Sequence, residues 1–567
     1  MKDMKKYKYI GVLGLCLAAG FTSCSLDEEP DSYYAQNNFF TNEDNAKLSV
    51  IGVYDNFASM KHYGQYEMAM PCSDDTYFIN GTNTDNTRRD IAHYTLTTTN
   101  QWVTPLWQYK YQGIDRANFA IAGIEGMAGY EENAKLQNYV AQAKFLRAFL
   151  AFDLIKYWGD VPFKTTYTSS FESAFGPRVS REVIYDQIIE DLKFAKNKLS
   201  APSASINPET PSQAAARALL MRVYLQRAGY SLQQDGTLTR PDDAKRAEYF
   251  KAVIDEWDVL KANGYNDLYP ETEGDNGYLA LFKNFSAGKY DSKESLWEIA
   301  FNPSGANFSE DCGMWGTYNG PEVAMPDANA DKTKVMGRAN AFFRVVPTWK
   351  DFFEDNDARR DVMVVTYSYK WKDGAHVKAE NKPEKWFPGK WRREWMPLGF
   401  VDPNNTDVNF CPLRFADAIL MAAEAYNETG NSAEAWSLIS RVRQRAGATP
   451  VTAANYADFY KAPKVYDLPF MDDANEQGKV RTALYWERGF ELAFEGQRKY
   501  DLIRWGVMDK ALKLFKNNLP ADALYDKVRK GYIAAEKFTP GKHELFPIPL
   551  DEIQANAKLE GKNNPGY

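Results

Sequence analysis

The chain has 567 residues, and its 76 acidic side chains outnumber 68 lysines and arginines, which gives a formal net charge of −8. This length suffices for one large domain or several small ones with a sizeable core. The acidic balance makes nucleic acid a poor partner. Five scattered cysteines without a CxxC spacing predict neither a disulfide framework nor a zinc site.

The N-terminus has the layout of a secretory signal. Lysines precede an apolar run over residues 10–19, which is too short to span a bilayer, and mostly small residues follow. Cys24 comes next, as in a bacterial lipobox, although Phe21 stands where leucine is usual. We therefore expect a lipoprotein signal peptide over residues 1–23 and acylation of Cys24, which would anchor the chain in a membrane. The alternative is an ordinary signal peptide with an incidental cysteine.

Residues 24–43 are polar and predict a flexible tether. Helical patterns then dominate residues 44–262. Apolar and alanine side chains occupy most sides of residues 140–158, which predicts a buried helix. Further helices are expected at 185–199, 213–228 and 250–260, with Ser212 as an N-cap. Short links between such helices are typical of helical repeats and resemble tetratricopeptide units, although the full signature of that repeat is absent.

From residue 263 to 408, glycine, proline, asparagine and aromatic residues replace the periodic pattern, and only residues 296–301 indicate a short strand. The aromatic density favours a functional loop region over disorder. Helices return at Leu413, after Asn431, and over residues 482–505, with a break near Gly496.

The sequence therefore predicts a mostly α fold, in which a tetratricopeptide-like helical-repeat scaffold carries a large loop-rich subdomain with short strands. We expect an N-terminal helical-repeat region at 44–262, a loop-rich insert at 263–408 and a C-terminal helical region at 409–567.

Five segments in order resemble the SusD-like (RagB/SusD) family of surface glycan-binding lipoproteins. They are FLRAF through GDVP at 145–162, RFADAILMAAEA at 414–425, VRQRAG at 442–447, the block ERGFELAFEGQRKYDLIRWG at 487–506, and LFPIP through NPGY at 545–567. The resemblance covers nearly the whole mature chain. Gly489, Phe490 and Gln497 depart from the family pattern, but they lie in a block that we interpret as structural.

The resemblance implies a protein on the cell surface, lipid-anchored to the outer membrane, that captures oligosaccharides. It would deliver them to a SusC-like TonB-dependent transporter without catalysis. Within the 487–506 block, Arg498, Asp501 and Arg504 flank apolar residues, which predicts ion pairs that hold the helix end against the loop region. We expect such residues to form the scaffold, and function to lie in the loops.

Enzyme and cofactor signatures are absent: there is no GxGxxG, P-loop, HExxH or GxSxG motif, and the four histidines are far apart in sequence. Asp74 and Asp75 resemble a glycosidase pair, but adjacent residues of an extended chain point to opposite faces. With Asp85 they could ligate a hard cation. Their spacing fits no known loop, so we expect solvated loop carboxylates, with no metal and no cofactor.

A sugar site needs aromatic platforms for C–H faces and polar side chains for hydroxyl groups. Two loop regions have this mixture and correspond to the regions that build the ligand surface in the family. The candidate ligand-binding residues are Asp74, Tyr77, Asn80, Asn83 and Arg88 in the first region, and Trp315, Tyr318 and Asn319 in the second. The alternative for each aromatic residue is that it packs the loop region onto the helices.

A third aromatic cluster, Trp371, Trp386, Trp391 and Trp395, lies among lysines and arginines, which favours cation–π packing at the surface. Three other functions remain open. The same fold could bind peptides, could be a surface glycoside hydrolase, or could stabilise a transporter without touching its substrate.

Overall fold

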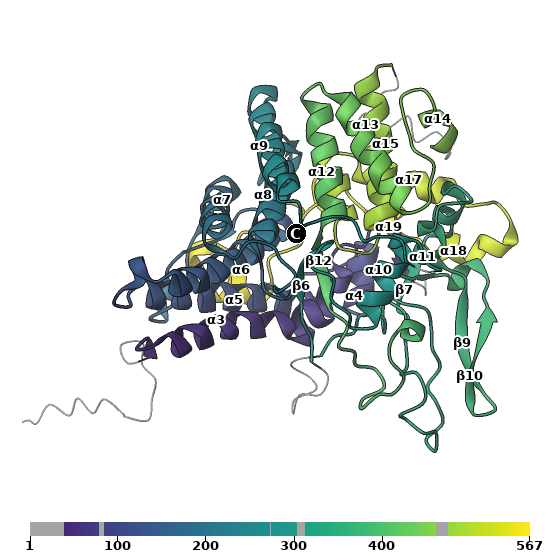
Figure 1. Ribbon diagram of the computed structural model, residues 1–567, viewed down its shortest axis with the longest axis horizontal. Coiled ribbons are helices and arrows are strands. Elements are labelled where there is room, and N and C mark those ends of the chain that lie inside the picture. Colours follow the sequence, from purple (N-terminus) through teal and green to yellow (C-terminus); the bar gives the residue numbers. More distant parts are fainter. Residues whose placement is uncertain (1–38, 79–83, 273, 303–311, 461–473) are drawn as a thin grey trace, which may run out of the picture.

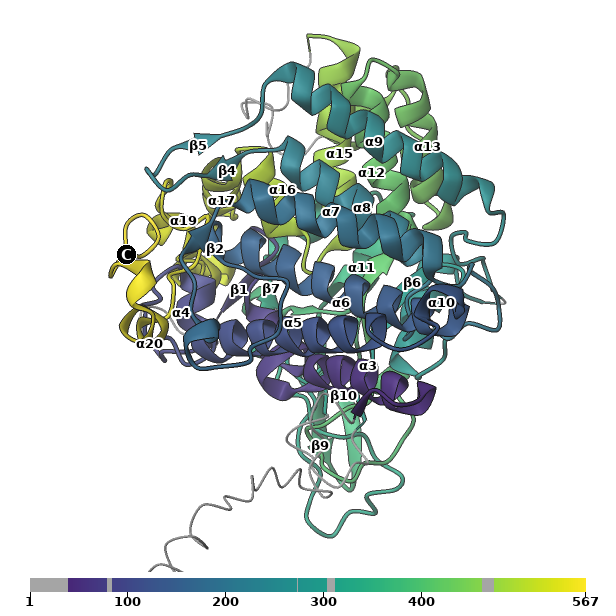
Figure 2. The same cartoon turned by 90° about the vertical axis from the view of Figure 1, so that its left-hand side faces the viewer.

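Long helices pack against one another in chain order. The computed structural model describes residues 39–567 except 79–83, 273, 303–311 and 461–473. The long helices of the first half are α3 (Glu43–Ala58), α5 (Val103–Glu125), α6 (Ala134–Trp158), α7 (Arg181–Lys198), α8 (Gln213–Ala228) and α9 (Asp243–Ala262). Each of them packs against the next one in this series (Figures 1 and 2). The series forms the predicted scaffold.

The C-terminal helices continue this scaffold. They are α12 (Phe415–Glu428), α13 (Ser432–Arg445), α15 (Glu476–Leu492), α16 (Arg498–Arg504) and α17 (Met508–Asn517). Helix α12 packs against α8, α9, α13 and α15 and thus joins the two halves (Figure 1). The predicted start of α12 at Leu413 was two residues early, because Phe410–Arg414 forms a strand. The predicted break lies between α15 and α16, where Gly496 has a φ of +87°, a value that glycine adopts readily.

The loop-rich region contributes one longer helix and short strands, which pair antiparallel with one another or with β1 and β12 outside the region. The bounds are α10 (Gly277–Ser286), β1 (Thr76–Phe78), β6 (Ser295–Ile299), β7 (Phe343–Val345), β8 (Val364–Val365), β9 (Tyr367–Lys372), β10 (Ala375–Glu380), β11 (Phe387–Pro388) and β12 (Phe410–Arg414). The pairs are β1–β7, β6–β12, β8–β11 and β9–β10. The β9–β10 hairpin projects from the body (Figure 1). The predicted strand at 296–301 corresponds to β6, and the mostly α fold with a loop-rich region of short strands is confirmed.

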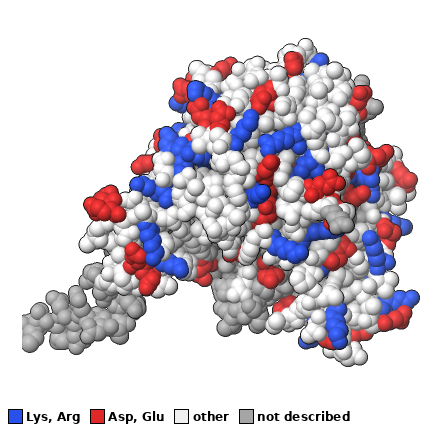
Figure 3. Space-filling view, viewed as in Figure 1, with Lys and Arg blue, Asp and Glu red and all other residues white. Residues whose placement is uncertain are grey.

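Short elements complete the chain. They are α4 (Arg88–His93), α11 (Arg359–Met363), α14 (Tyr456–Phe459), α18 (Asp526–Gly531), α19 (Ala534–Lys537), α20 (Leu550–Ala555), β2 (Val161–Pro162), β3 (Arg178–Val179), β4 (Ser231–Leu232) and β5 (Leu238–Thr239). On the face in Figure 3, acidic and basic side chains of the described residues are interspersed.

One hydrophobic core includes residues from all three predicted regions, for example Trp158, Trp349 and Trp486. The domain boundaries at residues 262 and 408 therefore stay a prediction. The signal peptide, Cys24 and residues 24–38 of the tether lie outside the described residues. No helix in the described ranges combines the length and apolar character that crossing a bilayer requires.

Candidate ligand-binding surface

Asp74 is held by the C-terminal block instead of facing a ligand. Its carboxylate accepts two hydrogen bonds from the Arg498 guanidinium, at 2.9 and 2.8 Å, and one from the Tyr485 hydroxyl at 3.3 Å. The Asp74 side chain is completely buried. Burial alone would lower the pKa of Arg498, but the charge and hydrogen bonds of Asp74, together with Tyr485 and Asp75, outweigh burial and raise that pKa. The pair joins the loop after η3 (Tyr66–Ala69) to α16.

The other charges of the block also serve the scaffold. Arg488 donates to Asp417 and to Asp501, at 2.8 Å each, and Arg504 pairs with Asp501 and with Glu424. All of these side chains are buried. They link α12, α15 and α16, so the expected ion-paired role of Asp501 and Arg504 is confirmed, within the helical scaffold instead of at the loop region.

Asp75 has its own partners. It accepts hydrogen bonds from Ser73 Oγ at 3.1 Å, Thr76 Oγ1 at 2.9 Å and the Phe494 amide at 3.4 Å. Burial, with a smaller contribution from the charge of Asp74, raises the pKa of Asp75 to about 6. The two carboxylates bind different groups inside the protein, so they do not form a pair across a glycosidic bond. The expectation that they are solvated is wrong, because the fold supplies buried donors for both.

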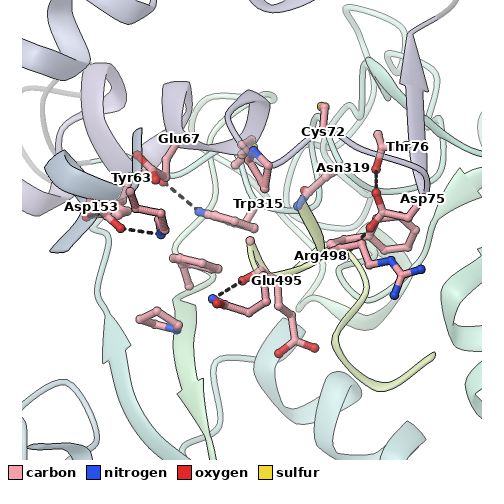
Figure 4. Close-up of a pocket in the computed structure, with 18 of the residues that line it drawn as sticks. Tyr63, Glu67, Cys72, Asp75, Thr76, Asp153, Trp315, Asn319, Glu495 and Arg498 are labelled. Carbon is pink, nitrogen blue, oxygen red and sulfur yellow. Dashed lines mark hydrogen bonds and ion pairs between the residues drawn. The ribbon is translucent and has the colours of Figure 1, made fainter. Parts of the chain in front are cut away.

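An interior pocket lies beside these residues (Figure 4). Lys110 donates to Glu67 at 3.2 Å and to Asp153 at 3.0 Å, and the Tyr63 hydroxyl donates to Asp153 at 2.5 Å. Burial raises the pKa of Glu67. It also opposes ionisation of Asp153, but Lys110 and Lys156 outweigh it and hold that pKa low. The polar groups of this pocket therefore satisfy one another, as in a structural network.

Trp315 lines the same pocket as part of the core. Its ring stacks on Phe410, with centroids 4.2 Å apart and an interplanar angle of 4°, and its Nε1 donates to the Tyr63 carbonyl at 3.1 Å. Asn319 accepts a hydrogen bond from the Gly316 amide at 2.8 Å, which closes a turn. The glycines around Trp315 let the chain pass close to Phe301, Trp391 and Met396 of the loop-rich region, although in sequence they resemble an open loop.

Tyr77 is also interior, and its hydroxyl donates to the Glu384 carbonyl at 3.2 Å. Packing and internal hydrogen bonds thus account for Asp74, Tyr77, Trp315 and Asn319, and the surface described next does not include them. Asn80 and Asn83 lie outside the described residues.

Arg88 and Tyr318 remain partly exposed and meet at the surface. The Arg88 guanidinium carbon lies 3.9 Å from the centroid of the Phe342 ring and 5.5 Å from that of Trp102. The rings of Tyr318 and Phe342 are 4.2 Å apart, and Tyr66 stacks on Trp102 at 4.5 Å with an interplanar angle of 8°. We refer to these five residues as the Arg88 surface.

Among the described residues, the Arg88 guanidinium has no hydrogen-bond or ion-pair partner. Its Nε atom is buried and likewise has no partner there. Burial lowers the pKa of Arg88, and Asp85 offsets part of this effect. The cation–π contact with Phe342 restricts a cation whose N–H groups can donate to an incoming acceptor.

The sequence named Arg88 and Tyr318 as candidates but gave no indication of Tyr66, Trp102 and Phe342. Trp102 is 4% exposed and directly precedes α5. Tyr66 and Phe342 carry no local signal, because only the fold brings residues so distant in sequence beside Arg88.

The third tryptophan cluster makes the expected cation–π contacts in two cases: Lys350 lies 5.3 Å from the Trp386 ring and Arg392 lies 4.2 Å from that of Trp395. Trp391 is buried, so its expected place at the surface was wrong. In the described part of the chain, no group of three or more histidine, cysteine or acidic side chains is arranged to hold a metal ion.

Two family models match the chain. One, described as the SusD family, matches residues 293–567, and the other, described as starch-binding associating with outer membrane, matches residues 25–225. The chain belongs to the SusD-like family. Together the two matches include the buried ion pairs of the C-terminal block and all five residues of the Arg88 surface.

Relatives share this architecture over almost their full length. A SusD-like protein, P2, of Formosa agariphila is 27% identical, with all of both chains covered. A SusD homologue from Bacteroides thetaiotaomicron has a TM-score of 0.76 at 25% identity, covering 94% of this chain and 98% of that one. Surface glycan-binding protein A of the same species, in complex with laminarihexaose, has a TM-score of 0.65 at 19% identity, covering 92% and 99%.

Proposed function

We propose that the protein captures oligosaccharides at the cell surface and does not cleave them. The observation that carries this proposal is the Arg88 guanidinium: its carbon lies 3.9 Å from the centroid of the Phe342 ring, between partly exposed rings, and its N–H groups have no partner among the described residues. Membership of the SusD-like family supports the proposal, since relatives include a laminarin-binding protein and a glycan-binding protein in complex with laminarihexaose.

The chemistry of the Arg88 surface suits a sugar. Tyr66 and Tyr318 offer ring faces for C–H groups, and each such contact contributes roughly 0.5–1.5 kcal/mol beyond burial. Arg88 can donate to hydroxyl oxygens, and its stacking on Phe342 reduces the conformational entropy lost on binding.

Delivery completes the proposed function. Acylation of Cys24 would hold the protein at the outer membrane, and a SusC-like TonB-dependent transporter would accept the captured sugar. A stable complex with such a partner buries roughly 2,000 Å² or more. Residues 24–43 would form the tether between the anchor and α3.

Titration calorimetry with laminarihexaose and a panel of other oligosaccharides tests the binding step. We expect Arg88→Ala and Tyr318→Ala to weaken binding of the recognised sugar by about 10-fold or more, since a hydrogen bond to a charged group contributes about 1.5–3 kcal/mol. Arg240→Ala is the matched control, because this partly exposed arginine lies just before α9 and outside the Arg88 surface.

Unchanged affinity in Arg88→Ala would contradict the assigned site. Binding of peptides in place of sugars, or new reducing ends after incubation with glycans, would refute the proposed function and support the peptide-binding or the hydrolase alternative.

A further inference from the structure

A second surface with ligand-binding chemistry lies between α3, α6 and β6 (Figure 2). It is a groove with a volume of about 430 Å³. Its walls include Ile51 and Tyr54 of α3, Tyr139 of α6 and Trp297 of β6. None of these residues belongs to the Arg88 surface. Ile51 is 46% exposed, which is unusual for so large an apolar side chain.

Two carboxylates stand together in this groove. The amide nitrogen of Asn409 donates to Glu209 and to Glu298, at 3.0 Å each, so one side chain bridges them. Tyr290 also donates to Glu209, at 2.5 Å, and Ser295 to Glu298, at 2.6 Å. In the described part of the chain, no lysine or arginine forms an ion pair with either carboxylate.

Without a paired lysine or arginine in the described chain, the charged form of Glu298 is disfavoured at this buried position. Glu298 is 3% exposed, and burial, with the nearby charges of Glu209 and Asp291, raises its pKa to about 7. Asp55 also lines the groove but pairs with Arg116 at 2.8 Å, so the excess of negative charge in the lining comes from Glu209 and Glu298 against the single cation of Lys47. In the wall, the Nε1 of Trp297 is buried without a hydrogen-bond partner.

Cationic groups are favoured by this arrangement. An ammonium placed between two carboxylates forms charge-assisted hydrogen bonds with both, and these are about twice as strong as neutral ones. The aromatic and aliphatic walls suit the C–H face of a ring attached to that ammonium. A groove of this size can hold several such rings.

We propose that this groove binds a saccharide carrying protonated amino groups, with an ammonium at Glu209 and Glu298 and sugar rings against Ile51, Tyr54 and Tyr139. The inference that the ligand is a saccharide rests on the proposed function. The inference that it carries an ammonium group rests on the two carboxylates alone.

Calorimetry with a tetramer of β-1,4-linked glucosamine tests the proposal, and the matched N-acetylated tetramer, which has no ammonium, is the ligand control. We expect the wild type to bind the glucosamine tetramer at least 10-fold more tightly than the acetylated one. Glu209→Gln keeps the acceptor for Tyr290 but removes the charge, and Ile51→Trp fills the groove. Each should weaken binding at least 10-fold.

Two variants complete the design. Glu248→Gln changes an exposed carboxylate on α9, outside the groove, and as the control it should retain the glucosamine tetramer within twofold. Arg88→Ala changes the other surface and shows which of the two surfaces holds the tetramer. No binding by the wild type, equal affinity for both tetramers, or unchanged affinity in Glu209→Gln would each overturn the proposal. If Arg88→Ala alone lost the tetramer, the amino sugar would bind the Arg88 surface, and the groove assignment would be wrong while the proposed function stood.

Discussion

Replacing Asp74 with alanine separates a scaffold role from a ligand role. The side chain is fully buried and receives two of the hydrogen bonds that Arg498 donates; the third goes to the Tyr485 carbonyl at 2.7 Å. In Asp74→Ala the Arg498 guanidinium keeps only that carbonyl and remains buried at 3% exposure. An uncompensated buried charge of this kind costs about 3–5 kcal/mol.

Thermal and urea unfolding measure this loss. We expect Tm to fall by roughly 2–4 °C, because the unfolding entropy grows with chain length and the shift per kcal/mol becomes correspondingly smaller. The double variant Asp74→Leu/Arg498→Met should recover much of the loss, since it leaves no unpaired charge in the same volume. Well below Tm, Asp74→Ala should bind the recognised sugar within about twofold of the wild type.

The opposite pattern would refute this reasoning. If Asp74→Ala unfolds like the wild type but no longer binds sugar, Asp74 is a ligand residue, and the buried pair with Arg498 contributes little. If the double variant is as unstable as the single one, the loss arises from packing and not from the stranded charge.

Three further outcomes are expected. Burial lowers the pKa of Lys499 to about 7, so above that pH the folded protein releases a proton that the unfolded chain keeps; wild-type stability should rise between pH 7 and 10. Lys499→Met should flatten this slope. At pH 6.5 it should also stabilise the protein by roughly 3 kcal/mol, a figure that allows for the lost cation–π contacts with Tyr94 and Phe546. Urea unfolding at pH 6.5 and at pH 10 measures both effects. Phe342→Ala should weaken sugar binding about 3- to 10-fold in calorimetry, because Arg88 loses the ring that orients it, while Tm changes little. Cys24→Ser should move the protein from the membrane fraction to the soluble fraction and abolish labelling with palmitate; retention at the membrane would contradict the proposed anchor.

Local structure was predictable because its causes are local. The spacing over residues 213–228 predicted a helix, and α8 has these bounds, with the Ser212 hydroxyl accepting a hydrogen bond from the Ala215 amide. The break near Gly496 followed in the same way from one residue type. Neighbouring strands were harder: Leu413 belongs to β12 because it pairs with Trp297, more than a hundred residues earlier.

The site was predictable only in part, because burial depends on distant partners. Asp74 looked like a loop carboxylate until the fold placed Arg498, 424 residues later, beside it. Trp315 looked like an exposed platform, but Phe410 covers its face. Composition therefore indicated candidate residue types, and only the three-dimensional contacts separated the partly exposed Arg88 and Tyr318 from the interior residues.

The contrast between two arginines carries the functional argument. Arg498 is buried, and its charge is compensated by Asp74, so its contribution to the fold is clear. Arg88 is partly desolvated without any acidic partner in the described chain, and burial lowers its pKa. Such an arrangement costs stability, and residues that break local energetic rules are expected where function requires them. A ligand that accepts hydrogen bonds from Arg88 would return the missing interactions, which is why binding explains this residue better than packing does.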